Sequence, residues 1–137
     1  MIDDKKYLYV KWSPISILEK CTQIYDGEKI RNITEEDKNQ IEKYLEKNAN
    51  NAMRNLGFAY KPLEIYDASS KRQDIENNLI FLWCTSIIDP PREEVPDAVR
   101  SAHEAKIKII MVTWDYWLTA EAIAKRIGLE DEKQVVM

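Results

Sequence analysis

The stretch from residue 79 to residue 112, LIFLWCTSIIDPPREEVPDAVRSAHEAKIKIIMV, decides the predicted fold. Residues 79–88 and 107–112 are predominantly apolar, which is typical of strands buried on both faces of a sheet. Between them, DPP at 89–91 ends the first run, and residues 92–105 have the apolar spacing of a helix. This order predicts a βαβ unit whose two strands are parallel neighbours joined by a right-handed crossover.

The residues before this unit predict two strands and two helices. Residues 6–11, KYLYVK, are rich in Tyr and Val and indicate a short strand. Residues 14–22 predict a short helix that opens on a proline. The TEED sequence at 34–37 has the form of a capping box, and it begins a helix that we expect to run to about residue 55. A second strand is predicted at residues 56–60.

The fold class that follows is α/β, of the α+β-like kind. Residues 64–78 are polar and predict a loop with some helix, and residues 118–127 predict a last helix. We expect one mixed sheet of about four strands packed with helices. The length of 137 residues suits a single compact domain over residues 1–137.

Composition excludes several classes of protein. The net charge is −4 with acids and bases interspersed, so the basic face of a nucleic-acid partner is not expected. The longest apolar run is about half of the roughly twenty residues that cross a membrane. The N-terminus has no signal pattern, which predicts a cytoplasmic or recombinant soluble protein. Two cysteines make no disulfide framework.

Four sequence motifs, taken in order, carry a family resemblance. They are KWSP at 11–14, MRNLGFAY at 53–60, LIFLWCTSIIDPPREEVPDAV at 79–99 and IKIIMVTWDYWLTAEAIAKRIGL at 107–129. On these motifs the chain resembles the P-type cation-transporting ATPases. The resemblance implies that residues 1–78 correspond to the end of the nucleotide-binding domain. It implies that residues 79–137 correspond to part of the HAD-like phosphorylation domain.

The resemblance also implies a set of nucleotide-site residues, with ATP and Mg²⁺ as the family's ligands. The matching positions are Lys11 in the nucleotide site, Arg54 near the phosphates, Asp89 and Arg92 of the hinge, and Thr113 and Asp115 beside the family's phosphorylated aspartate. The chain departs from the family because it has neither the DKTGT motif nor the GDGxND motif. Phosphoryl transfer needs a nucleophile, a metal and charge stabilisation together, so we expect a protein that does not pump.

All four tryptophans stand at motif positions. Trp12, Trp83 and Trp114 occupy glycine positions of the family, and Trp117 often corresponds to proline. This pattern favours an engineered protein on a pump-derived scaffold, in which Trp12 and Trp114 block the approach of nucleotide. Lys106 also stands at a usual glycine. The tryptophans are predicted to line a pocket for a small aromatic molecule, with an interaction surface or simple space-filling as the alternatives.

A cysteine and a histidine suggest a chemistry for such a pocket. Cys84 follows Trp83, and the chain's one histidine, His103, is predicted on the following helix at a similar height. A Cys–His pair supports acyl transfer, with the thiolate attacking an ester carbonyl and imidazole taking the thiol proton. The sequence therefore gives three hypotheses. They are a designed thiol esterase without cofactor or metal acting on an aromatic ester, a nucleotide-binding pump fragment, and an interaction surface of unknown oligomeric state.

Overall fold

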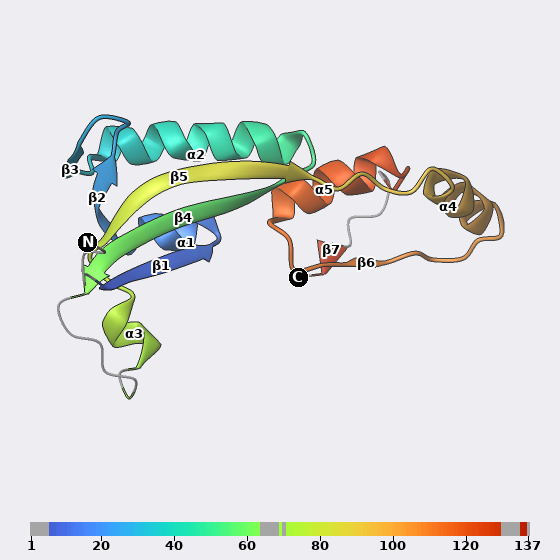
Figure 1. Ribbon diagram of the computed structural model, residues 1–137. Helices are drawn as coiled ribbons and strands as arrows, with labels where there is room; N and C mark the ends of the chain where they lie inside the picture. Colours follow the sequence, from blue (N-terminus) through green and yellow to red (C-terminus); the bar gives the residue numbers. More distant parts are fainter. Residues whose placement is uncertain (1–5, 64–68, 70, 130–134, 137) are drawn as a thin grey trace. The chain divides into compact units, whose positions relative to one another are not determined.

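The computed structural model describes residues 6–63, 69, 71–129 and the backbone of 135–136 (Figure 1). The backbone groups into two compact units. The first unit comprises Met1–Glu42 and Asn55–Thr85, and the second comprises Lys43–Arg54 and Ser86–Met137. The prediction of a single domain stays a prediction.

Five strands of the described chain form one mixed sheet in the order β1-β4-β5-β2-β3. They are β1 (Lys6–Trp12), β2 (Cys21–Tyr25), β3 (Ile30–Asn32), β4 (Met53–Leu63) and β5 (Leu79–Ile88). The pairs β1–β4 and β2–β3 are antiparallel, whereas β2 and β5 are parallel. The α/β class and the mixed sheet are confirmed, with one more strand than expected.

The described helices alternate with these strands. They are α1 (Pro14–Leu18), α2 (Glu35–Asn50), α3 (Arg72–Ile75), α4 (Val95–Glu104) and α5 (Trp117–Arg126). A separate two-stranded sheet pairs β6 (Met111–Val112) in parallel with β7 (Val135–Val136). The predicted helix over residues 14–22 is therefore too long, because Cys21–Tyr25 instead pairs with β5 and β3 as a strand.

The predicted parallel pairing of residues 79–88 with residues 107–112 is wrong. The neighbours of β5 are β4 and β2, so both of its edges are occupied, and β6 pairs with β7. Ile107 and Ile110 lie largely in solvent, and the strand is reduced to Met111–Val112. Residues 107–112 cannot pair with β5, because both edges of that strand are already occupied.

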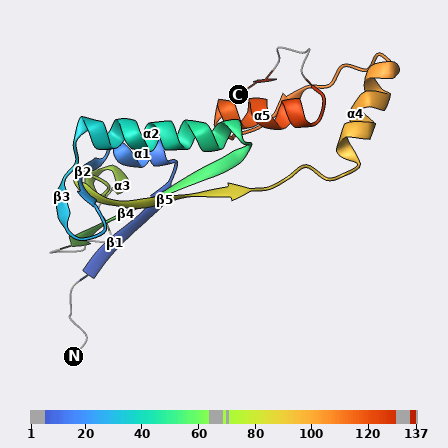
Figure 2. The ribbon, with the colours of Figure 1, turned by 90° about the horizontal axis from the view of Figure 1, so that it is seen from above.

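The core of the first unit lies on one face of its strands. Its buried members are Val10, Ile17, Leu18, Cys21, Ala59, Leu79 and Phe81. Helix α1 and the start of helix α2 cover this face (Figure 2). Strand β4 comes so close to α1 that a Cβ added at Gly57 would lie 2.8 Å from Cα of Pro14. Position 57 therefore requires glycine, because a Cβ there would clash with the Pro14 backbone. The second unit has its own cluster, formed by Val99, Ala124, Ile127 and Leu129.

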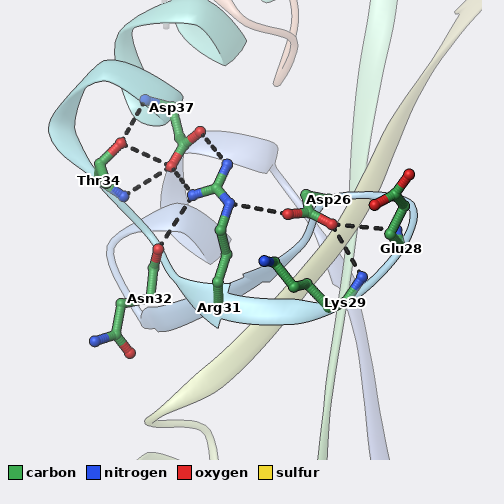
Figure 3. A network of polar contacts seen from close by, with 7 residues as sticks. All are labelled: Asp26, Glu28, Lys29, Arg31, Asn32, Thr34 and Asp37. Atoms are coloured by element: carbon green, nitrogen blue, oxygen red, sulfur yellow. Dashed lines mark hydrogen bonds and ion pairs between the residues drawn. The ribbon is translucent and has the colours of Figure 1, made fainter.

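A charged network joins the β2–β3 hairpin to the start of α2 (Figure 3). The Arg31 guanidinium donates to both carboxylate oxygens of Asp37, at 2.6 and 2.8 Å, and its Nε donates to Asp26 Oδ2 at 3.1 Å. Asp26 Oδ1 accepts from the backbone N–H groups of Glu28 and Lys29, which closes the turn. Arg31 therefore fixes where the helix begins relative to the hairpin.

The predicted capping box is confirmed at the same point. The Thr34 hydroxyl accepts from the Asp37 backbone N–H at 3.2 Å. The Asp37 carboxylate in turn accepts from the Thr34 N–H at 2.9 Å and from its hydroxyl at 2.7 Å. Asp37 thus serves as the reciprocal partner of the cap and as the counter-ion of Arg31.

Replacing Asp37 tests the network. We expect Asp37→Asn to lower the free energy of unfolding by about 1–2 kcal/mol at pH 7, because it weakens a cap and an ion pair together. Glu36→Gln is the control, since it removes the neighbouring charge of the same helical turn without touching Arg31. Urea unfolding measures both. Equal stability of the two variants would contradict the role of the network.

The same carboxylate gives a pH dependence. Hydrogen bonds from Arg31, followed by those from Thr34, hold the pKa of the Asp37 carboxyl well below its ordinary range. The stabilisation is therefore complete at pH 7. It is lost as the pH falls below about 4, where the unfolded carboxyl binds a proton before the folded one does. The stability difference between wild type and Asp37→Asn should shrink over that range.

Helix α4 ends on a residue with left-handed backbone. Lys106 has φ 56°. Its N–H donates to the His103 carbonyl, and the Ile107 N–H donates to the Ala102 carbonyl, both at 2.9 Å. This pattern is the Schellman motif, in which the residue just past the helix is usually glycine.

A residue with a Cβ is strained in the left-handed conformation, so glycine should be more stable than lysine at position 106. We expect Lys106→Gly to raise the free energy of unfolding by about 0.5–1 kcal/mol. Lys108→Gly is the matched control. It should lower the free energy of unfolding, because Lys108 does not have positive φ and glycine there only adds freedom to the unfolded chain. Thermal unfolding of both variants decides. A loss of stability in Lys106→Gly would count against the argument.

Candidate functional site

The register of β1 against β4 places Lys11 on the face of the first unit opposite its core. Val10 pairs with Ala59, and both are buried in the core. Lys11 pairs with Phe58, one residue along each strand, and successive side chains of a strand point to opposite faces. The Lys11 side chain therefore projects from the outer face, where it is exposed.

Aromatic rings flank Lys11 on this outer face. Tyr9 pairs with Tyr60, and their rings stack with centroids 6.0 Å apart and an interplanar angle of 21°. Tyr7 lies beside both, 6.2 Å from Tyr9 and 6.1 Å from Tyr60. On the other side, the Phe58 ring lies 5.4 Å from that of Trp83. We call Tyr7, Tyr9, Tyr60, Phe58 and Trp83 the aromatic strip.

Trp12 lies apart from this strip. As the residue after Lys11 in β1, it leaves the strand on the core side, so the expected block of the Lys11 face by Trp12 has no support in the strand geometry. The Arg72 guanidinium lies 5.8 Å from the centroid of the Trp12 ring. Arg72 also donates to Glu76 at 2.6 Å, and Glu76 accepts from Lys20 at 3.0 Å. The Arg72–Trp12 contact joins α3 to the end of β1, and the Lys20–Glu76 pair joins it to the turn between α1 and β2.

The second unit brings three of the implied site residues together. Arg54 Nε lies 3.2 Å from Asp115 Oδ1. The Thr113 hydroxyl donates to Asp115 Oδ2 at 3.1 Å and accepts from the Asp115 backbone N–H at 3.1 Å. Asp115 is half-buried, whereas the Arg54 side chain is largely exposed. Asp89 and Arg92 belong to the same unit and are exposed in the segment between β5 and α4.

The four tryptophans divide between the units. Trp12 and Trp83 belong to the first, and Trp114 and Trp117 to the second. Their exposed fractions are 59%, 55%, 97% and 47%, respectively. These values do not fit the space-filling alternative. A pocket or interface built from them stays a prediction, as does the engineered origin.

The proposed nucleophile and base also belong to different units, Cys84 to the first and His103 to the second. Cys84 packs against the first core, and burial raises the pKa of its thiol, which keeps the group protonated at neutral pH. His103 Nε2 is buried without a hydrogen-bond partner among the described residues. The esterase hypothesis therefore gains no support, and it stays a prediction.

Two other features of the described residues bear on the kind of site. Their His, Cys, Asp and Glu side chains form no group of three or more that could hold a metal ion. Their helices include none that is long and apolar enough to span a bilayer.

Sequence reasoning missed the tyrosines and Phe58 as site residues. The signal was the alternation in KYLYVK, which puts Tyr7, Tyr9 and Lys11 on one face of a strand. The partner positions Tyr60 and Phe58 depend on the register with β4, which only the structure supplies.

Comparison with known proteins places the chain in a family. The model of the family described as P-type ATPase, cytoplasmic domain N, matches residues 2–94. The match covers more than half of the 137 residues, and the chain belongs to the P-type ATPase family. The resemblance found in the sequence motifs is thereby confirmed.

Several transport proteins are similar to nearly the whole chain. The calcium-transporting ATPase 1 of Lactococcus lactis is 36% identical over 98% of the chain. The cation-transporting ATPase pma1 of Synechocystis is 39% identical over 94%, and the calcium-transporting ATPase of Plasmodium falciparum is 36% identical over 98%. The chain spans 15%, 14% and 12% of the lengths of these three proteins.

Thiol reactivity tests the chemistry available to the cysteines. Burial raises the pKa of Cys21 from 9.0 to about 12, so its thiolate is about a thousandfold scarcer than that of an ordinary cysteine at neutral pH. We expect both thiols to react with a disulfide reagent more slowly than free cysteine does, and Cys21 more slowly than Cys84. Cys21→Ala and Cys84→Ala assign the two phases. Fast labelling of Cys84, or ester turnover lost in Cys84→Ala, would revive the esterase hypothesis.

Proposed function

We propose that the chain binds an ATP-class nucleotide and does not transport ions, as a piece of a P-type ATPase. The observation that carries this proposal is the position of Lys11. Its side chain projects from an exposed sheet face that also carries aromatic rings, which suits a ligand with both an anionic and a planar part. The match to the family's cytoplasmic domain N supports the same reading.

The roles of the residues follow from their chemistry. Lysine binds phosphate as a point charge on a long stem, and Lys11 is proposed as the phosphate contact of the first unit. Arg54 and Arg92 lie in the second unit, and their contact with phosphate stays a prediction from the family resemblance. Arg54 is held by Asp115 at 3.2 Å, and an incoming phosphate would compete with that carboxylate for the guanidinium.

Hydrolysis is not part of the proposal. The 137 residues contain no DKTGT motif to supply the aspartate nucleophile, and no GDGxND motif. Positioned cations without a nucleophile bind a nucleotide and leave it intact. ATP added to the protein should therefore be recovered without hydrolysis.

Calorimetric titration with ATP tests the proposal. We expect binding with a dissociation constant of about a millimolar, since one exposed lysine and a few rings supply little affinity. Lys11→Ala should weaken it about tenfold, through loss of a charge-assisted contact. Lys6→Ala is the control, because Lys6 lies on the same strand and projects from the opposite face. No heat with wild type, or equal losses in both variants, would refute the proposal.

A further inference from the structure

The turn between β2 and β3 contains the chain's one Asp-Gly sequence, Asp26–Gly27. Residues 25–30 are exposed, and Gly27 has φ 101°, a left-handed conformation that glycine adopts without strain. A Cβ added at Gly27 would meet no atom within 4 Å outside its chain neighbours. The peptide bond between Asp26 and Gly27 is therefore open to solvent.

An aspartate that precedes glycine can react with its own backbone, because no Cβ shields the glycine nitrogen. In this reaction the Gly27 nitrogen forms a bond to Cγ of Asp26 and gives its proton to solvent, while a carboxyl oxygen leaves as water. The product is a succinimide ring, which water then opens at either carbonyl. Breaking the bond from nitrogen to Cγ restores aspartate, whereas breaking the bond from nitrogen to the α-carbonyl carbon gives isoaspartate.

Hydrogen bonds in the folded protein restrain the Asp26 carboxylate (Figure 3). Its Oδ1 accepts from the N–H groups of Glu28 and Lys29 at 3.1 and 3.0 Å, and its Oδ2 accepts from Arg31 Nε at 3.1 Å. Turning Cγ toward the Gly27 nitrogen would break these bonds. The N–H of Lys29, followed by that of Glu28, also lowers the pKa of the Asp26 carboxyl. An ionised carboxylate resists the attack, because its oxygen cannot leave as water.

Arg31 differs from the other two donors because it is anchored outside the turn. It lies on β3, and its guanidinium also donates to Asp37 at the start of α2. The N–H groups of Glu28 and Lys29 belong to the turn and move with it, whereas Arg31 ties the carboxylate to the helix. Loss of Arg31 should therefore release the carboxylate.

We propose that Asp26–Gly27 is a latent site of isoaspartate formation, which the contact between Arg31 and Asp26 keeps closed in the folded protein. Isoaspartate carries the main chain through Cγ, which lengthens the main chain by one carbon and shortens the side chain. The carboxylate can then no longer hold the turn and Arg31 together. The modification therefore separates the hairpin from the start of α2 with no change in the protein's mass.

Incubation of the full chain at neutral pH tests this proposal, with isoaspartate at residue 26 followed over time. A protease that cleaves before aspartate leaves isoaspartate uncut, and mass spectrometry measures the uncut fraction. Folded wild type is compared with wild type in guanidinium chloride and with folded Arg31→Thr, in which threonine keeps strand propensity. Circular dichroism confirms that each variant is folded during incubation.

Matched variants separate the Arg31 contact from a general loss of stability. Asp37→Asn is the control, because it weakens the same network and leaves the contact between Arg31 and Asp26 in place. Asp26→Glu assigns the signal, because its longer side chain would have to close a larger ring and should give none. If Arg31→Thr does not fold, Arg31→Lys replaces it, because an ammonium lacks the forked donors that reach both carboxylates at once.

The expected rates are specific to the released carboxylate. Isoaspartate should form about tenfold faster in folded Arg31→Thr than in folded wild type, since one hydrogen bond between charged groups is worth about that factor. Asp37→Asn should stay close to folded wild type, and unfolded wild type should react fastest.

Three results would overturn the proposal. They are equal rates in folded and unfolded wild type, equal rates in the Arg31 variant and Asp37→Asn, and no isoaspartate at residue 26 of the unfolded chain. Nucleotide takes no part in these measurements, so their outcome is independent of the proposed function.

Discussion

The register between β1 and β4 is the constraint on which the first unit depends. Val10 opposite Ala59 points into the core, and Lys11 opposite Phe58 points out of it. Because side chains alternate, a slip of one residue would bury Lys11 and expose Val10. The free energy of burying the apolar face therefore also fixes the chemistry of the outer face. The close approach of Gly57 to Pro14 adds a steric reason for this register, since a Cβ there would meet backbone.

A second constraint acts where the chain leaves the β2–β3 hairpin. Arg31 is held by carboxylates on both sides, one from the turn and one from the first turn of α2. Each contact limits the positions that the other can take, so the hairpin and the helix start are ordered together. Arg31 donates two hydrogen bonds to Asp37 and one to Asp26. Only a guanidinium carries donors arranged for both contacts at once. The network orders the scaffold and lies outside the proposed ligand contacts.

Local signals in the sequence predicted local structure well. The capping box at Thr34 and the start of the helix were readable because the interacting atoms lie within one turn, whereas the helix ends at Asn50 and not near residue 55. Pairing between distant segments was not readable. Residues 107–112 look like a central strand by composition, yet β5 had no free edge for them. Cys21 and Thr22 looked like the end of a helix, but the pairing of Cys21–Tyr25 with β5 and β3 outweighed that preference. The tyrosine pair was invisible for the same reason, because it depends on the register of two strands more than forty residues apart.

The glycine positions occupied by tryptophan show how far a family pattern constrains one chain. Glycine is needed where φ is positive or where another backbone comes close. None of the three tryptophans at these positions, Trp12, Trp83 and Trp114, has positive φ, whereas Lys106, at another usual glycine, does. The tryptophan positions therefore accept a large side chain without backbone strain, and the family's glycines there are not explained by conformation in this chain. What a tryptophan changes at these points is the surface, since Trp12, Trp83 and Trp114 are each more than half exposed. Trp83 adds to the aromatic strip around Lys11, whereas Trp12 projects from the other side of the strand. The same substitution therefore has different consequences at the two sites. The Trp83 ring lies 5.4 Å from that of Phe58 on the outer face, whereas alternation along β1 turns Trp12 to the core side.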